Sequence, residues 1–387
     1  MSGAPPRAIG IDARKIHDAG IGRHVEGLLG ALAALDGPER FVLFLRDPDR
    51  AGLPGDLPQR LDPDRFRLAR CAAPLYSVRE LLAFRGVARA HRLGLLHIPH
   101  YVRPFVPGSP VTVTIHDAIH LEEPPSWAAW TYARAMMAWA VRSSAALLTV
   151  SEASRADLER VLPESRGKWH VAPNGVDLVR FARPSEDALA AFRRARGLDS
   201  DFVLVVASHR PHKNLAAAVR AFSAAAPSDL HLVLPARDDE AARRLAPFVR
   251  GVPRARLLAP VPDAHLPGLY AAARVVLVPS RREGFGLPGL EAAACGAAVL
   301  ASPIAAHREV LGDAAAYAAT PSVDDLAEAL RALASDAARR AALARAGPAR
   351  AALFPWRELA ARTLAVWRSV LDPRAPGSRP AAPSANL

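Results

Sequence analysis

The sequence contains few of the residues that build disulfide frameworks or structural metal centres. Its 387 residues include two cysteines, Cys71 and Cys295, which are too few for either a disulfide framework or a zinc site. Long apolar runs are also missing. The sequence has no stretch of about 18 apolar residues, the length needed to span a bilayer. No N-terminal stretch has the apolar core of a signal peptide. These absences favour a protein of the cytoplasm.

Acidic residues are in the minority, with 38 Asp and Glu against 50 Lys and Arg, so that the net charge is +12. Such a balance can attract nucleic acid, an anionic membrane or an anionic substrate, or it can reflect arginines spread over solvated faces. No zinc-finger spacing, RNP motif or basic–aromatic interleaving supports nucleic-acid binding. A basic cluster, Arg79, Arg85, Arg89 and Arg92, favours association with an anionic membrane surface.

Buried-strand runs alternate with helical patterns along the chain, which predicts an α/β protein. The hydrophobic share is 51%, the mean hydropathy is +0.07, and the length suits two globular domains. Residues 46–75 are predicted to form a long connection, and residues 178–198 a linker region. The predicted strands are 8–12, 41–45, 95–99, 111–115 and 145–150 in the first half, then 202–207, 231–234, 256–258, 275–280 and 298–301.

One strand–turn–helix segment, residues 275–295, organises the sequence. A buried strand leads into a glycine-rich turn and then into a helix, with Pro288 predicted at the first helical position. Glycines let backbone N–H groups approach a ligand, and a helix that begins behind such a turn is an anion site. Two carboxylates, Glu283 and Glu291, bracket the turn. A sugar nucleotide, which has a diphosphate and several hydroxyl groups, suits this arrangement.

A second strand–loop–helix segment, residues 202–225, carries two cations in its loop. Arg210 and Lys213 precede a helix that is expected to begin at Leu215, with Asn214 as its N-cap. A leaving diphosphate gains negative charge as its glycosidic bond breaks. An arginine fork and a lysine point charge therefore stabilise the transition state more than the ground state. Because these cations replace what a divalent ion would do, no metal is predicted.

The loop Gly20-Ile21-Gly22-Arg23 is predicted between the first strand and a helix that begins at His24. A strand-to-helix turn with two glycines can admit a phosphate or a sugar. Such turns are common, however, and Arg23 could equally be a surface residue at the start of the helix. The loop is therefore a candidate site only in combination with other residues.

His116 and Asp117 follow the strand 111–115, and ligands of open α/β sheets collect at the carboxyl ends of strands. A histidine there can hydrogen-bond a sugar hydroxyl. Its backbone carbonyl can also stabilise positive charge at the anomeric carbon. The alternative is a buried, hydrogen-bonded structural pair.

These segments together resemble a known enzyme family. Glu283 and Glu291, with residues 284–288 between them, are similar to the E-x7-E motif of retaining glycosyltransferases of the GT-B fold, family 4. The glycine loop, the His-Asp pair and the Arg/Lys loop also match and occur in the family's order. Residues 170–177 and 309–315 match further segments, so that the resemblance covers nearly the whole chain.

The resemblance implies two Rossmann-like domains that face each other across a cleft. Residues 1–184 would form the acceptor-side domain and residues 185–354 the donor-nucleotide-binding domain. A C-terminal helix, 355–371, would pack back onto the first domain. Residues 372–387 are rich in Pro, Ala and Ser and are expected to be a disordered tail.

The family implies a role for each matching residue. Glu283 would grip hydroxyls of the transferred sugar, or act as a nucleophile like the carboxylate of retaining glycosidases. Positioning is favoured, since family members are usually described with front-face attack, in which the departing phosphate takes the acceptor proton. The implied catalytic residues are Glu283, His116, Arg210 and Lys213. The implied donor-binding residues are Gly22, Arg210, Lys213, Gly284, Phe285, Gly286, Leu287 and Glu291, of which Glu291 would bind the ribose. The implied acceptor-side residues are Gly20, Arg23 and Asp117.

The implied activity is transfer of a hexose from a nucleoside-diphosphate sugar, with retention, to a saccharide or lipid-linked saccharide in cell-surface polysaccharide assembly. GDP-mannose is the favoured donor, because His-Lys-Asn loops such as residues 212–214 occur in many mannosyltransferases; UDP-glucose is close behind. No cofactor is implied. The basic surface adds the expectation of peripheral association with the inner face of the cytoplasmic membrane.

Two other functions stay open. A sugar-nucleotide 2-epimerase shares the fold but needs carboxylates that abstract the C2 proton, and the E-x7-E spacing disfavours it. A degenerate, non-catalytic transferase would scaffold a polysaccharide complex, although all the signature residues are present. The sequence also departs from the family at His307-Arg308, where leucine-proline is frequent before Glu309, which leaves the sugar undecided.

Overall fold

The computed structural model describes residues 8–225 and 227–372, and the chain divides into two compact units. Unit 1 contains the residues up to 175 together with those from 356 onwards, and unit 2 contains residues 176–355. The boundary predicted after residue 184 falls inside unit 2. The tail predicted for 372–387 lies, apart from Asp372, outside the described residues. No helix within the described ranges is both long and apolar enough to cross a membrane.

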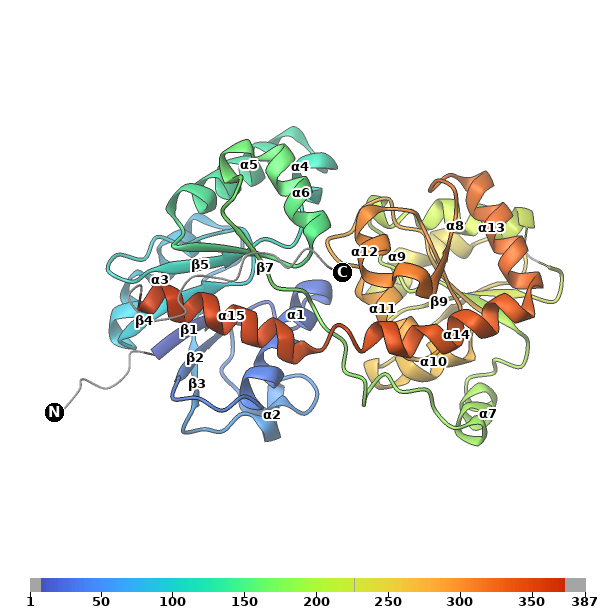
Figure 1. Ribbon diagram of the computed structural model, residues 1–387, viewed down its shortest axis with the longest axis horizontal. Coiled ribbons are helices and arrows are strands. Elements are labelled where there is room, and N and C mark those ends of the chain that lie inside the picture. Colours follow the sequence, from blue (N-terminus) through green and yellow to red (C-terminus); the bar gives the residue numbers. More distant parts are fainter. Residues whose placement is uncertain (1–7, 226, 373–387) are drawn as a thin grey trace. The chain divides into compact units, whose positions relative to one another are not determined.

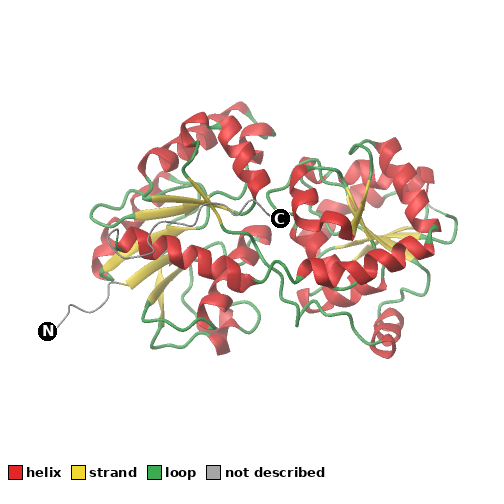
Figure 2. Ribbon diagram, in the orientation of Figure 1, coloured by secondary structure: helices red, strands yellow, loops and turns green. Residues whose placement is uncertain are grey.

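Unit 1 is built on a parallel sheet of seven strands in the order β3-β2-β1-β4-β5-β6-β7. Figures 1 and 2 show helices on both faces of this sheet. The strands are β1 Ala8–Asp12, β2 Phe41–Leu45, β3 Phe66–Arg70, β4 Leu93–Ile98, β5 Val111–Thr114, β6 Ala146–Thr149 and β7 Trp169–Val171. The helices are α1 Ala19–Ala33, α2 Leu57–Arg60, α3 Val78–Ala90, α4 Ile119–Glu122, α5 Trp127–Ser143, α6 Glu152–Val161 and α15 Trp356–Leu371, with 3-10 turns Arg50–Gly52 and Pro163–Ser165.

Strand β2 shows how both faces of this sheet are buried. Phe41 and Leu43 pack with α1 and α15, whereas Val42 and Phe44 on the opposite face pack with α3 and α5. Such a strand is apolar at every position, as expected for a parallel sheet covered on both sides. Helix α15 lies against α1 at Gly27, where an added Cβ would fall 2.3 Å from the ring of Trp356.

Unit 2 is built on a parallel sheet of six strands in the order β10-β9-β8-β11-β12-β13. One face of this sheet is covered by α8 and α13, and α11 contacts the inner strands β11 and β12. The strands are β8 Phe202–Leu204, β9 His231–Pro235, β10 Ala255–Leu258, β11 Val275–Val278, β12 Val299–Ala301 and β13 Ala315–Tyr317. The helices are α7 Glu186–Ala195, α8 Leu215–Ala225, α9 Asp239–Val249, α10 Leu266–Ala272, α11 Leu287–Ala294, α12 Ala305–Leu311, α13 Val323–Ser335 and α14 Ala337–Ala351, with 3-10 turns Pro211–Lys213, Asp263–His265 and Gly312–Ala314.

Both units have a point where the strand order reverses. The first strand of each sheet lies in the interior, with the second and third strands on one side and the fourth on the other. In such doubly wound sheets, ligands bind outside the carboxyl ends of the strands at this switch point. The switch points lie between β1 and β4 in unit 1 and between β8 and β11 in unit 2. The α/β architecture predicted from the alternating runs is therefore confirmed, and it directs attention to the residues that follow these four strands.

Several local predictions were wrong. The connection predicted for 46–75 contains the edge strand β3, whose sequence FRLAR is too polar to show as a buried strand. The predicted linker 178–198 contains α7. Helices α9 and α14 were not predicted, and each has a proline in its interior, a residue that normally argues against a helix. Helix α1 begins at Ala19 rather than at His24, so that the predicted glycine loop is its first turn.

Candidate active site

In unit 2, the switch point brings Lys213 and Glu283 together. Lys213 follows β8 through a short 3-10 turn, and Glu283 follows β11. The Lys213 Nζ donates to both carboxylate oxygens of Glu283, at 2.7 and 2.8 Å, and the Ser280 Oγ donates to Glu283 Oε1 at 2.7 Å. The two loops are also joined through the backbone, where the Arg281 N–H donates to the His212 carbonyl at 2.8 Å.

The Glu283 carboxylate is ionised. Burial alone would raise the pKa of Glu283, but the Lys213 ammonium, assisted by the Ser280 hydroxyl, holds that pKa below its ordinary value. The two side chains remain 21% and 10% exposed, so that the pair borders on solvent. Its carboxylate can accept hydrogen bonds from the hydroxyl groups of a ligand.

Arg210 lies in the same loop and is exposed. Among the described residues, its side chain has no hydrogen-bond or ion-pair partner. A guanidinium in this position can form a bidentate contact with a phosphate. The side chain of Asn214 does not cap helix α8, contrary to the prediction. Its amide instead donates to the Pro279 and Pro321 carbonyls, at 3.1 and 2.9 Å, and its backbone has φ +56°.

The glycine-rich turn ends at Gly286, which has φ +95° and precedes helix α11. Phe285 is buried and packs edge-on against Phe354, so that only its backbone is available to a ligand. Pro288 is the second helical residue, not the first as predicted, and it has no N–H. The N–H groups of the next two residues both donate to the Gly286 carbonyl. The helix therefore offers an anion fewer donors than the sequence implied, and the cations of the neighbouring loop gain importance.

Glu291 lies in the second turn of α11 and is only 5% exposed. The Tyr270 hydroxyl, from α10, donates to its Oε2 at 3.0 Å. This contact orients the carboxylate. Tyr270 was not predicted from the sequence. Its spacing in an apolar helix is typical of a core residue, and only the fold brings it to Glu291.

His307 was noted in the sequence only as a departure from the family pattern. In the structure, its Nδ1 donates to the Ser302 carbonyl at 3.0 Å, which leaves Nε2 as an acceptor. This Nε2 is buried and has no hydrogen-bond partner within the described ranges. A Cβ on Gly286 would lie 3.0 Å from the imidazole, so that a glycine is needed there for His307 to fit beneath the turn.

The switch point of unit 1 contains four buried polar residues that the sequence analysis did not assign to a site. Arg14 donates to the Asp12 carboxylate at 2.6 and 2.8 Å and to Glu80 Oε1 at 2.8 Å. The His100 Nε2 lies 3.3 Å from Asp12 Oδ2. Burial alone would raise the pKa of Asp12, but hydrogen bonds from Arg14 and His100 hold it well below its ordinary range.

Three of these side chains have the spacing of a metal site, since ligand atoms of Asp12, Glu80 and His100 lie within 4.8 Å of one another. The Arg14 guanidinium, however, already donates to two of the three. An internal cation therefore pairs with both carboxylates of this cluster, and all four side chains are at most 2% exposed. A charged residue at the end of an otherwise apolar buried strand, as Asp12 is, was the signal that could have identified the cluster.

Gly20 and Gly22 lie in the first turn of α1. The Gly22 N–H donates to the Asp18 carbonyl at 2.8 Å, and a Cβ on Gly22 would lie 2.4 Å from the Ile16 carbonyl oxygen. This glycine therefore has a packing role, and its N–H is engaged within the helix. Arg23, on the same turn, is mostly buried, and its Nη1 lies 3.4 Å from Glu26 Oε2.

His116 and Asp117 follow β5, as predicted. The His116 Nε2 donates to the Pro99 carbonyl at 3.0 Å, and burial lowers the pKa of His116 to about 4. The imidazole is therefore neutral at pH 7, with Nδ1 as an acceptor. The His116 carbonyl already accepts from the Ser154 hydroxyl at 2.8 Å. The Asp117 Oδ1 accepts from the Ile119 N–H at 3.0 Å, a local contact at the start of α4.

The sequence matches two family models. Residues 19–180 match the model described as glycosyltransferase family 4, and residues 200–336 match the model described as glycosyl transferases group 1. Among curated proteins, the chain is 30% identical over 234 residues to the O-antigen chain mannosyltransferase B of Escherichia coli, an alignment that covers 58% of this chain and 61% of that protein. It is 32% identical over 253 residues to the D-inositol 3-phosphate glycosyltransferase of Kribbella flavida, covering 60% of this chain and 58% of that protein. The aligned region thus spans about three fifths of these relatives.

The structure is similar to that of the Anabaena protein HepE in complex with UDP and glucose. The TM-score is 0.73 at 18% identity, and the match covers 94% of this chain and all of the HepE chain. At this identity the likeness establishes the fold, which is GT-B. Taken with the two family models, it shows that the chain belongs to the glycosyltransferases of group 1, family 4.

Proposed function

We propose that this protein transfers a hexose from a nucleoside-diphosphate sugar to a saccharide or lipid-linked saccharide, with retention of the anomeric configuration. The observation that supports this most is the Lys213–Glu283 pair beside the exposed Arg210, at the switch point of unit 2. It combines two cations for a diphosphate with a carboxylate for sugar hydroxyls. The proposed reaction needs the cations to bind the diphosphate and the carboxylate to bind the sugar.

Lys213 and Arg210 bind the donor diphosphate in this proposal. An ammonium has three N–H donors, so Lys213 can keep its contact with Glu283 while it binds a phosphate oxygen. As the glycosidic bond breaks, the departing diphosphate gains charge, which both cations stabilise. Gly22 is not proposed to contribute its N–H, because that group is engaged within α1.

Glu283 positions the transferred sugar. Its lowered pKa keeps it ionised, and an ionised carboxylate accepts hydrogen bonds from hydroxyl groups. The departing phosphate, in front-face attack, takes the proton of the acceptor hydroxyl. The same carboxylate could instead attack the anomeric carbon, and a glycosyl adduct trapped on Glu283 would establish that alternative.

Three further residues have proposed roles. Glu291, oriented by Tyr270, binds the ribose hydroxyls. The Nδ1 of neutral His116 accepts a hydrogen bond from a sugar hydroxyl. Asp117 supports this segment through its contact at the start of α4.

GDP-mannose is the proposed donor, since the E. coli relative is named as a mannosyltransferase. UDP-glucose is the second candidate, and the HepE complex with UDP and glucose favours it. We also propose a cytoplasmic location with peripheral attachment to an anionic membrane, which the net charge of +12 supports.

The test is product analysis by NMR after incubation with each donor in the presence of EDTA, with and without mannose oligosaccharides. We expect nucleoside diphosphate and an α-linked product from an α-linked donor. An inverted product would contradict retention. Epimerised sugar nucleotide formed without acceptor would identify an epimerase. Nucleotide binding without turnover of any acceptor would indicate a scaffold.

A further inference from the structure

An open cavity of about 980 Å³ lies at the amino ends of the unit 1 strands, whereas the switch point lies at their carboxyl ends. Its lining includes the residues at the starts of β1, β2 and β4, among them Ala8, Phe41 and Leu93. Because the strands are parallel, the carboxyl ends lie at the other edge. A five-residue strand such as β1 is about 17 Å long. The cavity is thus separated from Asp12, His100 and His116 by the length of the sheet.

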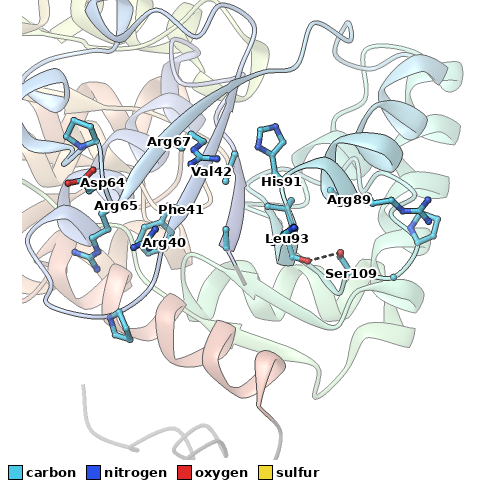
Figure 3. A pocket seen from close by; sticks show the side chains of 17 residues that line it. Arg40, Phe41, Val42, Asp64, Arg65, Arg67, Arg89, His91, Leu93 and Ser109 are labelled. Atoms are coloured by element: carbon cyan, nitrogen blue, oxygen red, sulfur yellow. Dashed lines mark hydrogen bonds between the residues drawn. The ribbon is translucent and has the colours of Figure 1, made fainter. Parts of the chain in front are cut away.

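The charge of this cavity is strongly one-sided. Figure 3 shows arginines around it from several elements, with Arg40, Arg65 and Arg67 on one side and Arg89 on the other. Arg92 also lines the cavity, and Asp64 is the single acidic residue among the described residues that line it.

Four of these arginines have side chains without a hydrogen bond or ion pair to any residue in the described part of the chain. They are Arg40, Arg67, Arg89 and Arg92, and all four are exposed. Burial and, after it, the charge of Arg67 lower the pKa of His91, another lining residue. Unpaired like charges around one cavity repel each other, and this repulsion is relieved when an anion binds.

Arg65 differs from the other four. Its guanidinium donates to the Leu35 carbonyl at 2.6 Å and to the Leu32 carbonyl at 3.2 Å, at the C-terminal end of α1. It therefore has a structural role and is not counted among the arginines available to a ligand.

We propose that this cavity binds a phosphate-bearing ligand through Arg40, Arg67, Arg89 and Arg92. Guanidinium groups match phosphate oxygens in a bidentate geometry, and several of them around a cavity this large suit more than one phosphate charge. The proposal goes beyond the transfer reaction and does not depend on it, since these residues lie away from the carboxyl ends of the strands.

Two sources can supply this chemistry, an anionic lipid headgroup or a soluble polyphosphate compound. Both carry phosphate oxygens of the kind that guanidinium groups bind, and vesicles and a soluble polyphosphate distinguish them experimentally.

The test compares the full chain with two triple variants. The cavity variant is Arg40→Gln/Arg67→Gln/Arg89→Gln. The matched control is Arg194→Gln/Arg220→Gln/Arg243→Gln, which removes the same charge from exposed positions of unit 2. Each protein is floated with phosphatidylcholine vesicles, with and without phosphatidylglycerol, and titrated calorimetrically with tripolyphosphate. Far-UV circular dichroism checks that both variants are folded, since it reports on the helices and strands of both units.

We expect the wild type and the control to bind at least one probe, and the cavity variant to lose about tenfold in affinity for each arginine removed. Binding to phosphatidylglycerol vesicles identifies a headgroup site, and binding to tripolyphosphate alone identifies a soluble ligand. A second tripolyphosphate site at Lys213 would persist in the cavity variant and disappear in Lys213→Met. Equal losses in both triple variants, or a wild type that binds neither probe, would overturn the proposal.

Discussion

The two units have the same order in their first strands but differ at their switch points. In unit 1, Arg14 forms ion pairs with both Asp12 and Glu80 inside the protein, and the cluster is almost completely buried. In unit 2, Lys213 and Glu283 border on solvent, and Arg210 beside them has no partner among the described residues. One switch point is therefore closed by the chain's own side chains, whereas the other keeps charge available for a ligand.

Topology thus provides a place for a ligand but does not by itself make a binding site. Both sheets direct loops to the same kind of crevice. Whether a ligand can bind in this crevice depends on how many of its polar side chains already form hydrogen bonds and ion pairs with each other. We expect substitutions at the two switch points to affect different properties, stability in unit 1 and donor handling in unit 2.

Arg14→Met should have the largest effect. It leaves the buried carboxylates of Asp12 and Glu80 without their cation, and breaking a buried pair in this way costs about 3–5 kcal/mol. All six tryptophans of the chain lie in unit 1, so that urea unfolding followed by tryptophan fluorescence reports on this unit. Lys213→Met is the control and should leave this transition unchanged. An unaltered transition in Arg14→Met would refute the assigned role.

Glu283→Gln should reduce kcat/KM by at least about 100-fold, because the sugar loses the charged acceptor that orients it. Nucleoside-diphosphate affinity should change little, since Arg210 and Lys213 remain. Steady-state kinetics and calorimetric titration measure the two quantities. Glu328→Gln, an exposed acidic residue on α13, is the matched control. Comparable losses in both variants would contradict the proposal for Glu283.

Acidification should destabilise unit 1. Burial lowers the pKa of both His24 and His97 to about 3, whereas the unfolded chain titrates near the ordinary value of about 6.5. As the pH falls from about 6.5 towards 4, the unfolded state binds protons that the folded state does not. The free energy of unfolding should therefore decrease by about 1.4 kcal/mol per pH unit for each histidine.

The same urea experiment, repeated between pH 7 and 4, tests this expectation. The stability that depends on Asp12 should be lost only at lower pH, because its pKa is held well below the ordinary range. A tryptophan-reported transition that does not change over this interval would show that these histidines are not buried in their neutral form.

Arg210→Ala should have the smallest effect of the four, a loss of about tenfold in nucleoside-diphosphate affinity accompanied by slower turnover. The side chain is exposed, so that folding should not be affected. Arg220→Ala, on helix α8 of the same unit, is the matched control. Equal affinities in the wild type and Arg210→Ala would remove this arginine from the donor site.

The sequence predicted the inner strands of both sheets because their apolar runs leave little alternative. It did not predict β3, α9 or α14, which are edge or surface elements whose polar residues or internal prolines hide their structure. In the site, residues that follow strands were predictable from position. Lys213 and Glu283 are separated by 69 intervening positions, and no local pattern shows that their side chains bond directly.

The remaining site residues depended on long-range packing. Tyr270 reaches Glu291 and His307 lies beneath Gly286 only because α10, α11 and α12 are folded together. Glu80 meets Arg14 across 66 positions of sequence. A single sequence contains no signal for such contacts beyond the presence of polar residues in otherwise apolar segments.

The most direct test of the central claim is calorimetric titration of the wild-type protein with GDP, UDP, ADP and TDP in the presence of EDTA. We expect one nucleoside diphosphate, GDP in the favoured case, to bind with one site per chain, and Lys213→Met to weaken this binding. Absence of binding by all four nucleotides to a folded sample would contradict the claim that the switch point of unit 2 is a metal-independent donor site.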